Sequence, residues 1–348
     1  MEHNKITIID ENIVMTSSQL PFGFSLKTLN VSYLDEIHNL LNNHYIEDKQ
    51  QIIRIVYSKD YLYWYLKNIP IGLIVGLIYN NKLVGMITAA IFDIAIYDSV
   101  IQIPFVNFLC LQKKIRNANL ASYLINEIKN RILKREIKYA IFTSFATRID
   151  KIKNLSELFC TIKKSAIPIN YPKLKNVEFL MEDLPPIIRY NNNPFHLMQE
   201  QDIDIIVPKL NEFLKKYQLR QYFTNNSAKH YFLPKKNIVY SFVAKNNKTI
   251  TDFVVIYKTY IYCLDRHKMV NVANLAYYYY ESMDLTELIE YLLDKLSSYG
   301  FDQLFYSNYA DNDTINFTHF DTNNDLNYHF YNTDIKNMIS SDICLYAP

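Results

Sequence analysis

The hydrophobic pattern changes most clearly between residues 103 and 142. Ile103 to Leu111 is an apolar run rich in β-branched and aromatic residues, which predicts a buried strand. From about Ala118 the apolar positions take helical spacing, at Leu120, Tyr123, Leu124, Ile128 and Ile132. Residues 139–142 return to a strand pattern. The segment therefore predicts strand, turn, helix and strand, with Asn117 or Asn119 as the helix cap.

The predicted turn before this helix is basic. Lys113, Lys114 and Arg116 lie within it. The free N–H groups and the dipole at a helix N-terminus both favour anions, so we predict a binding site for a phosphorylated ligand. A solvated basic turn is the alternative interpretation.

The order of predicted elements occurs twice. Helix, helix, hairpin, strand and strand–helix–strand recur about 166–169 residues apart, with Leu41-Asn42 matched by Leu210-Asn211. The hairpin turn at Asn80-Asn81 is matched by the Asn-Asn turn that follows Lys245. We expect an α/β (α+β) chain of two tandem related halves, divided into an arm at 1–19 and halves at 20–185 and 195–348.

Composition narrows the class of protein. The 348 residues carry a net charge of +2, which requires neither nucleic acid nor an acidic membrane as partner. The four cysteines have no metal-ligand spacing, no run of about 18 apolar residues occurs, and the five glycines form no phosphate-binding loop. We expect a monomeric cytoplasmic protein, in the host cytoplasm if its source is a virus, without a bound metal or a transmembrane segment.

Residues 107–121 carry a resemblance to a known family. Asn107-Phe-Leu-Cys110, Lys113-Lys-Ile-Arg116 and Leu120-Ala121 resemble the N-F-L-C-x-x-K-K-L-R-S-K-R-[VL]-[AT]-P signature of glycylpeptide N-myristoyltransferases, members of the GNAT acyltransferase superfamily. Residues 40–64, 213–242, 251–253 and 327–332 resemble further family motifs. The resemblance covers about 20–348 and is weak at 145–195. It implies two GNAT-like halves related by a pseudo-twofold axis in one compact unit.

The resemblance implies a CoA site in the first half. In the family this turn holds the pyrophosphate and the 3′-phosphate of CoA. The family's S-K-R positions are Asn117-Ala118-Asn119 here, so we expect weaker binding. The residues implied to contact acyl-CoA are Asn107, Cys110, Leu111, Lys113, Lys114, Arg116, Asn117, Asn119, Leu120 and Ala121.

The resemblance also implies the catalytic groups. The backbone amides of Phe108 and Leu109 would bind the thioester oxygen, which requires an irregular strand; an ordinary buried strand is the alternative. Thr143, where Ser144-Phe145 replaces the Ala-Gly of the family's T-A-G motif, would orient the amine. The α-carboxylate of Pro348 would accept the amine proton, with a frayed terminus as the alternative.

The implied peptide contacts are Tyr45, Glu47, Asp48 and Asp325. The first three match a loop over the peptide groove, where Lys49 replaces a third acid; Asp325 lies near the family's G-D-G without its glycines. The family's Y-W-H-R segment has no clear counterpart, and its F-W-x-T-Q-P-V is absent from 1–19.

The resemblance implies transfer of a myristoyl group from myristoyl-CoA, the cosubstrate, to the N-terminal glycine of a protein or peptide. Substrates would begin Met-Gly with Met already removed. Two alternatives stay open. One is a degenerate, non-catalytic protein that binds acyl-CoA or acylated peptide; the other is a GNAT N-acyltransferase of another acyl length. Competition between acyl-CoAs of different chain length would distinguish the last alternative. A long acyl pocket buries many CH₂ groups, and each contributes about 0.8 kcal/mol to binding.

Overall fold

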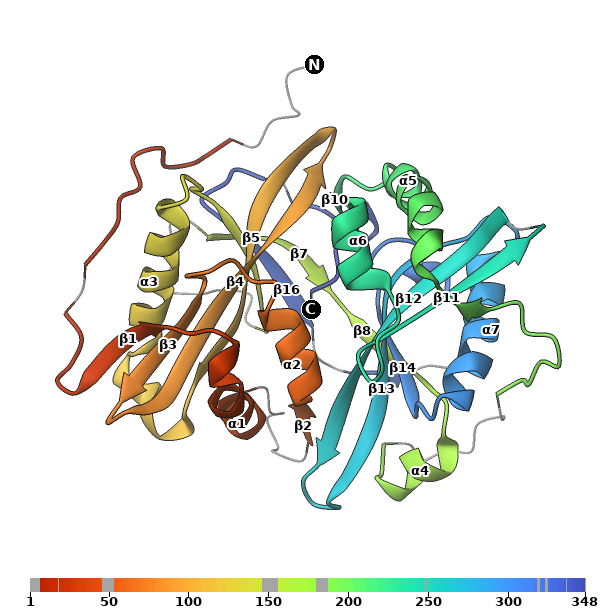
Figure 1. Ribbon diagram of the computed structural model, residues 1–348, viewed down its shortest axis with the longest axis horizontal. Coiled ribbons are helices and arrows are strands. Elements are labelled where there is room, and N and C mark those ends of the chain that lie inside the picture. The colour runs from red at the N-terminus through yellow and green to blue at the C-terminus, as the bar shows by residue number, and fades with distance from the viewer. Residues whose placement is uncertain are drawn as a thin grey trace. The chain divides into compact units, whose positions relative to one another are not determined.

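The computed structural model describes residues 7–17, 19–45, 53–145, 156–179, 187–247, 249–317, 320–322, 325–335 and 337–347. The chain divides into two compact units (Figure 1). Unit 1 comprises 1–161 with 326–338, and unit 2 comprises 162–325 with 339–348. Among the described helices, none is both long and apolar enough to cross a membrane.

Unit 1 is a mixed sheet with helices on both faces. Its antiparallel strands surround one parallel pair, β5–β6. The Cys110 thiol points to the backbone of α1, whereas a Cβ on Gly85 would meet Leu111 and α3. Successive side chains of a strand point to opposite faces, so α1 and α3 cover opposite faces. The strand order is β1 (Phe24–Thr28), β3 (Ile74–Tyr79), β4 (Lys82–Ile96), β5 (Ser99–Leu111), β6 (Ala140–Ser144), β16 (Leu326–Tyr331) and β7 (Ser156–Ile162), with α1 (Leu34–His44), α2 (Lys59–Leu66), α3 (Ala121–Leu133) and the short β2 (Ile53–Val56).

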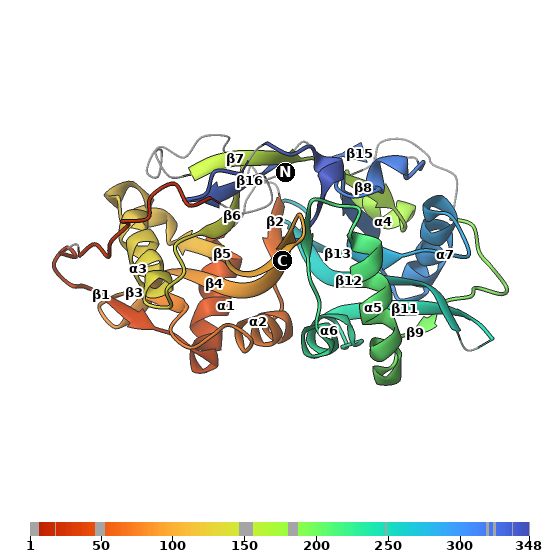
Figure 2. The ribbon, with the colours of Figure 1, turned by 90° about the horizontal axis from the view of Figure 1, so that it is seen from above.

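Unit 2 repeats this plan with the elements labelled β8 to β15 and α4 to α7 in Figure 2. The strands β13 and β14 form a parallel pair that corresponds to β5–β6. Apolar residues of α7, among them Leu288, Ile289 and Leu292, pack in one core with Val254, Ile256 and Leu304 of the sheet. The strand order is β15 (Phe320–Asp321), β8 (Lys164–Pro168), β14 (Gln303–Ser307), β13 (Lys268–Tyr279), β12 (Thr249–Cys263), β11 (Val239–Asn246) and β9 (His196–Leu197), with α4 (Tyr171–Asn176), α5 (Ile203–Leu214), α6 (Asn225–Phe232), α7 (Leu285–Ser298) and the parallel pair β10 (Leu219–Gln221) and β17 (Ile343–Cys344).

One pair of asparagines supports the internal duplication. Asn42 of α1 donates to the Tyr57 carbonyl (3.1 Å) and accepts from the Tyr57 N–H (3.0 Å). Asn211 of α5 makes the same two bonds to Phe223, at 2.8 and 3.0 Å. The next residue in each half, Ser58 or Thr224, then caps α2 or α6. The same side chain thus sets the same helix-to-helix path twice.

The N-terminal arm runs along unit 1. Asp10 and Asn332 exchange two hydrogen bonds, and Asn332 also donates to the Lys138 carbonyl (3.0 Å). Thr16 is bonded through its backbone to the Asn130 amide on α3. The predicted extended arm therefore packs against α3 and the end of β16.

The mixed α/β prediction is confirmed. Residues 82–96 form one long strand, β4, and the tail after Asn332 contains the short strand β17. Neither unit is one continuous stretch of sequence, because β16 pairs with β6 of unit 1 and β8 pairs with β14 of unit 2. That the halves form one compact unit with pseudo-twofold symmetry stays a prediction.

Candidate active site

The strand β5 contains a bulge at Phe108 and Leu109. The ladder pairs Asn107 with Thr88 and Cys110 with Met86, so these two residues oppose Ile87 alone. Phe108 has φ +52°, a left-handed conformation that a bulky residue rarely adopts. Such bulges turn backbone N–H groups out of the ladder. The strand irregularity that the predicted oxyanion hole requires is therefore present.

An aromatic cluster holds the bulge in place. The ring of the buried Phe108 lies 5.5 Å from Tyr45, 5.3 Å from Tyr57 and 5.4 Å from Tyr65, centroid to centroid. Burial raises the pKa of the Tyr57 and Tyr45 hydroxyls, so both are neutral donors. Edge and tilted contacts of this kind stabilise ring pairs beyond their buried area. The cluster offsets the cost of the strained φ.

Asn107 joins the bulge to the end of α1. Its side-chain Oδ1 accepts from the Phe108 N–H (2.8 Å) and from the Tyr45 hydroxyl (3.2 Å). Tyr45 terminates α1, its N–H donating to the Leu41 carbonyl. Tyr45, predicted to contact the peptide, thus donates to the side chain of Asn107, predicted to contact acyl-CoA.

The Cys110 thiol is excluded as a nucleophile. Cys110 is buried, and burial raises its pKa to about 12, although the charge of Arg116 opposes this. The thiolate is the reactive form, and it is scarce at neutral pH. Exchange of Cys110 for Ala should therefore leave kcat for acyl transfer within about twofold, measured by CoA release. Inactivation of the folded protein by iodoacetamide at Cys110 would contradict this.

The turn after β5 leads into α3 without a side-chain cap. Lys113–Ala118 forms a 3₁₀ turn, Asn119 takes φ +57°, and α3 begins at Ala121. The predicted cap by Asn117 or Asn119 is wrong: the cap position is Leu120, with no side-chain bond to the first turn. Lys113, Lys114 and Asn117 are exposed. Arg116, predicted to contact acyl-CoA, donates to the carbonyls of His44 and Leu111, so its guanidinium also braces the turn.

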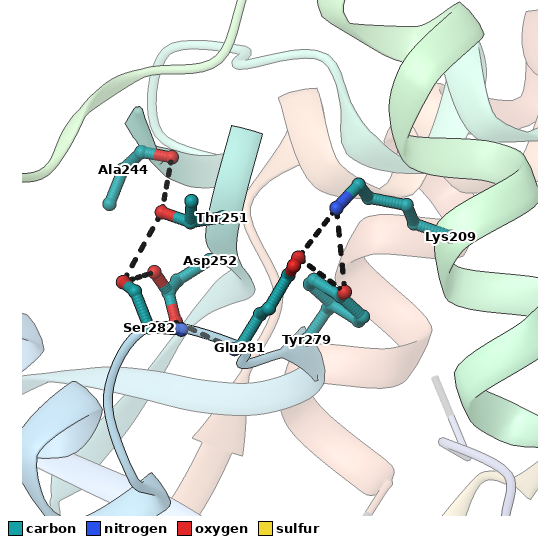
Figure 3. A network of polar contacts seen from close by, with 7 residues as sticks. All are labelled: Lys209, Ala244, Thr251, Asp252, Tyr279, Glu281 and Ser282. Carbon is teal, nitrogen blue, oxygen red and sulfur yellow. Dashed lines mark hydrogen bonds and ion pairs between the residues drawn. The ribbon is translucent and has the colours of Figure 1, made fainter. Parts of the chain in front are cut away.

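The corresponding turn of unit 2 carries its own carboxylates (Figure 3). Asp252, fully buried, accepts from the N–H groups of Glu281 and Ser282 at 2.9 and 3.1 Å and from the Ser282 hydroxyl. Asp284 caps α7. Asp252 is the fourth residue of β12, and the fourth residue of the equally long β4 is Gly85. The turn amides of unit 2 are thus bonded by carboxylates, whereas the first turn of α3 contains no acidic residue. Only the unit 1 turn is suited to an anionic ligand.

The strands β5 and β6 separate beside the bulge. They are paired at Phe105–Ile141 and Val106–Phe142, and neither pairing nor register extends to Thr143 within the described strands. We call this end of the pairing the fork. The bulge lies on the β5 side of the fork and Thr143, half-buried, on the β6 side. The sequence therefore brings Phe108, Leu109, Thr143 and the basic turn into one unit.

The remaining predicted residues divide as follows. Asp325 is exposed and directly precedes β16. Glu47, Asp48 and Pro348 lie outside the described residues. The tail is described to residue 347, with Leu345 buried and the Tyr346 N–H donating to the Tyr277 hydroxyl (3.2 Å). Among the described residues no group of His, Cys, Asp and Glu is arranged to hold a metal ion.

Structural comparison shows a GNAT-like fold. A GCN5-related N-acetyltransferase from Anabaena variabilis matches with TM-score 0.52 at 9% identity, over 88% of this chain and 72% of that one. Saccharomyces cerevisiae N-myristoyltransferase with bound myristoyl-CoA matches far better, with TM-score 0.87 at 21% identity over 99% of this chain and 95% of that one.

Sequence comparison then defines the family. The two profiles described as the N- and C-terminal domains of myristoyl-CoA:protein N-myristoyltransferase match residues 5–153 and 178–343. A protein of Acanthamoeba polyphaga mimivirus named for glycylpeptide N-tetradecanoyl transfer is 50% identical over 88% of this chain and 85% of its own length. The glycylpeptide N-tetradecanoyltransferase of Plasmodium falciparum is 30% identical over 82% of this chain and 72% of its own. The chain belongs to the N-myristoyltransferase family.

Proposed function

We infer that the chain transfers a myristoyl group from myristoyl-CoA to the N-terminal glycine amine of a protein or peptide. The bulge at Phe108 and Leu109 carries this inference, because it interrupts the strand ladder beside a basic turn without a side-chain cap, as the proposed oxyanion donors require. Membership of the family and the names of the relatives supply the substrates. The proposal includes a monomeric enzyme working in the cytoplasm, the host cytoplasm if the source is a virus.

The amides of Phe108 and Leu109 would polarise the thioester carbonyl. The thioester oxygen would take the place of Asn107 Oδ1 as acceptor of the Phe108 N–H. Charge grows on that oxygen as the amine attacks, and donors that are already fixed stabilise it at little reorganisation cost. The tetrahedral intermediate then expels CoA as a thiolate, and an amide forms. The neutral, buried Cys110 takes no part.

The basic turn and the first turn of α3 would bind the CoA phosphates. Removal of both exposed charges, Lys113→Ala with Lys114→Ala, should weaken myristoyl-CoA binding about fivefold to tenfold at low salt. The difference should shrink as salt rises, because exposed charges are screened. Isothermal titration at two salt concentrations measures both effects. Lys134→Ala with Lys138→Ala, at the far end of α3, is the control; an equal loss there would refute the site.

The peptide would lie against the loop that begins at Tyr45. We propose that Glu47 and Asp48 favour basic residues in the peptide, with Asp325 as a further acid. Exchange of Glu47 and Asp48 for Gln and Asn should raise KM for a lysine-containing octapeptide. KM for the same peptide with norleucine in place of lysine should stay unchanged.

An amine must lose a proton to attack. We propose that Thr143 orients the amine and that, in a chain ending at Pro348, the terminal carboxylate takes the proton. Close to the end of the described tail, Leu345 is buried and the Tyr346 N–H donates to the Tyr277 hydroxyl. Extension by one alanine moves the carboxylate by about 3.8 Å and should lower kcat without changing myristoyl-CoA affinity. An unchanged kcat would discard this role alone.

The decisive experiment mixes the purified chain with myristoyl-CoA and a Gly-Asn-x-x-Ser-type octapeptide and measures free CoA. Peptide-dependent release supports the proposal. Binding of myristoyl-CoA without release indicates a binding protein. Faster release from acetyl- or decanoyl-CoA indicates a GNAT enzyme of another acyl length, because a long pocket gains about 0.8 kcal/mol per buried CH₂.

A further inference from the structure

The strand β16 pairs with β6 up to its last residue. The ladder of β5 with β6 pairs Phe105 with Ile141 and Val106 with Phe142, whereas β16 pairs with Thr143 through Tyr328 and with Ser144 through Asn327. Phe145, the next residue, is exposed. The position of Thr143 is therefore set by how firmly β6 is held to β16.

A side-chain pair joins these strands at this end. Ser144 Oγ lies 3.0 Å from His329 Nε2. The His329 side chain is 2% exposed, and its ring stacks on Phe142 at 4.9 Å and 4° between planes. The hydrogen bond is part-buried, so its loss leaves the buried imidazole without this partner, and the stacked Phe142 ring fixes the orientation of the imidazole. His329 thus contacts both neighbours of Thr143 along β6, Phe142 and Ser144. We call the pair of Ser144 and His329 the clamp.

The clamp lies on the face of β6 opposite to Thr143. Side chains alternate along a strand, so Phe142 and Ser144 share one face and Thr143 takes the other. The clamp thus leaves the Thr143 hydroxyl uncovered while fixing its backbone. Both partners also differ from the family motifs that this chain resembles. Ser144 takes the place of the alanine of T-A-G, and residues 327–332 (NYHFYN) resemble x-Y-Y-L-Y-N, in which His329 takes the place of the second tyrosine. Two departures that meet at one hydrogen bond are better explained together than separately.

We propose that Ser144 and His329 are positioning residues for acyl transfer, which hold β6 against β16 so that Thr143 keeps its orientation at the fork. This inference rests on the proposed function of Thr143. The pair does not contact either substrate and acts only through the placement of Thr143.

The test compares Ser144→Ala with the wild-type chain in the CoA-release assay. We expect kcat to fall about fivefold to tenfold, the effect of one buried hydrogen bond, while the Kd of myristoyl-CoA stays within twofold. In a Thr143→Val background the same exchange should cost nothing more, because no hydroxyl is left to position. The double variant Ser144→Ala with His329→Tyr, which restores both motif residues, should recover most of kcat.

A matched control lies on the same sheet face. Thr161 of β7 donates to the buried Asn327 Oδ1 (2.7 Å), on the other side of β16 from Ser144. Thr161→Val should change thermal stability about as much as Ser144→Ala, with kcat unchanged. An unchanged kcat in Ser144→Ala, a full loss in the Thr143→Val background, or an equal kcat loss in Thr161→Val would overturn the inference. If the wild-type chain releases no CoA, the proposed function falls and the inference falls with it.

Discussion

Exchange of Leu109 for proline should lower kcat for myristoyl transfer about 10²-fold to 10³-fold, the effect of removing one oxyanion donor. Proline has no N–H, so the variant deletes the proposed donor; it also fixes φ at position 109 and restricts the backbone of Phe108. Leu109 is 39% exposed and lies in a bulge, where proline is tolerated. Single-turnover CoA release with saturating peptide measures the effect on the chemical step.

The matched control is Leu109→Ala, which keeps the N–H and shortens the side chain. We expect its kcat to stay within about threefold of the wild type, since a half-exposed leucine contributes little packing. The Kd of myristoyl-CoA should change less than kcat in the proline variant, because the oxyanion contact strengthens as charge develops. Equal losses in both variants would show that the Leu109 side chain, and not its amide, matters.

Periodicity in the sequence predicted most elements, and the failures have physical reasons. The apolar spacing of α3 and the repeated helix–helix–hairpin order correspond to the structure. Thr88 and Ala89 weaken the apolar run of β4, yet both are fully buried and the strand continues through them. The capping prediction failed because α3 begins at Ala121, so the cap position falls on Leu120, and Asn119, in a left-handed conformation, lies one residue before it.

The candidate site was predictable only in part. The signature at 107–116 located the bulge, and the resemblance gave the roles of its amides, which stay predictions. Contacts between distant residues carried no local signal, as Asn107 with Tyr45 and Ser144 with His329 show. The carboxylates on the unit 2 turn were also missed. Comparison of Gly85 with Asp252, at matching places in the repeat, is the signal that would have found them.

Phe108 is buried and also has a strained backbone conformation, and two substitutions separate the effects of these features on stability. Phe108→Ala should lower the free energy of unfolding by about 3–5 kcal/mol, the cost of emptying a buried aromatic site. Phe108→Gly should be about 1 kcal/mol more stable than Phe108→Ala, because glycine adopts φ +52° without the Cβ clash. Urea unfolding followed by circular dichroism gives both values.

Phe105 of the same strand supplies the control, since it is equally buried and is absent from the residues with positive φ. There the order should reverse: Phe105→Gly should be about 0.5–1 kcal/mol less stable than Phe105→Ala, as in any regular strand. The same order at both positions would show that the bulge stores no strain. The reversed order would show that the aromatic cluster holds Phe108 in a conformation its own backbone disfavours, which is what fixed oxyanion donors require.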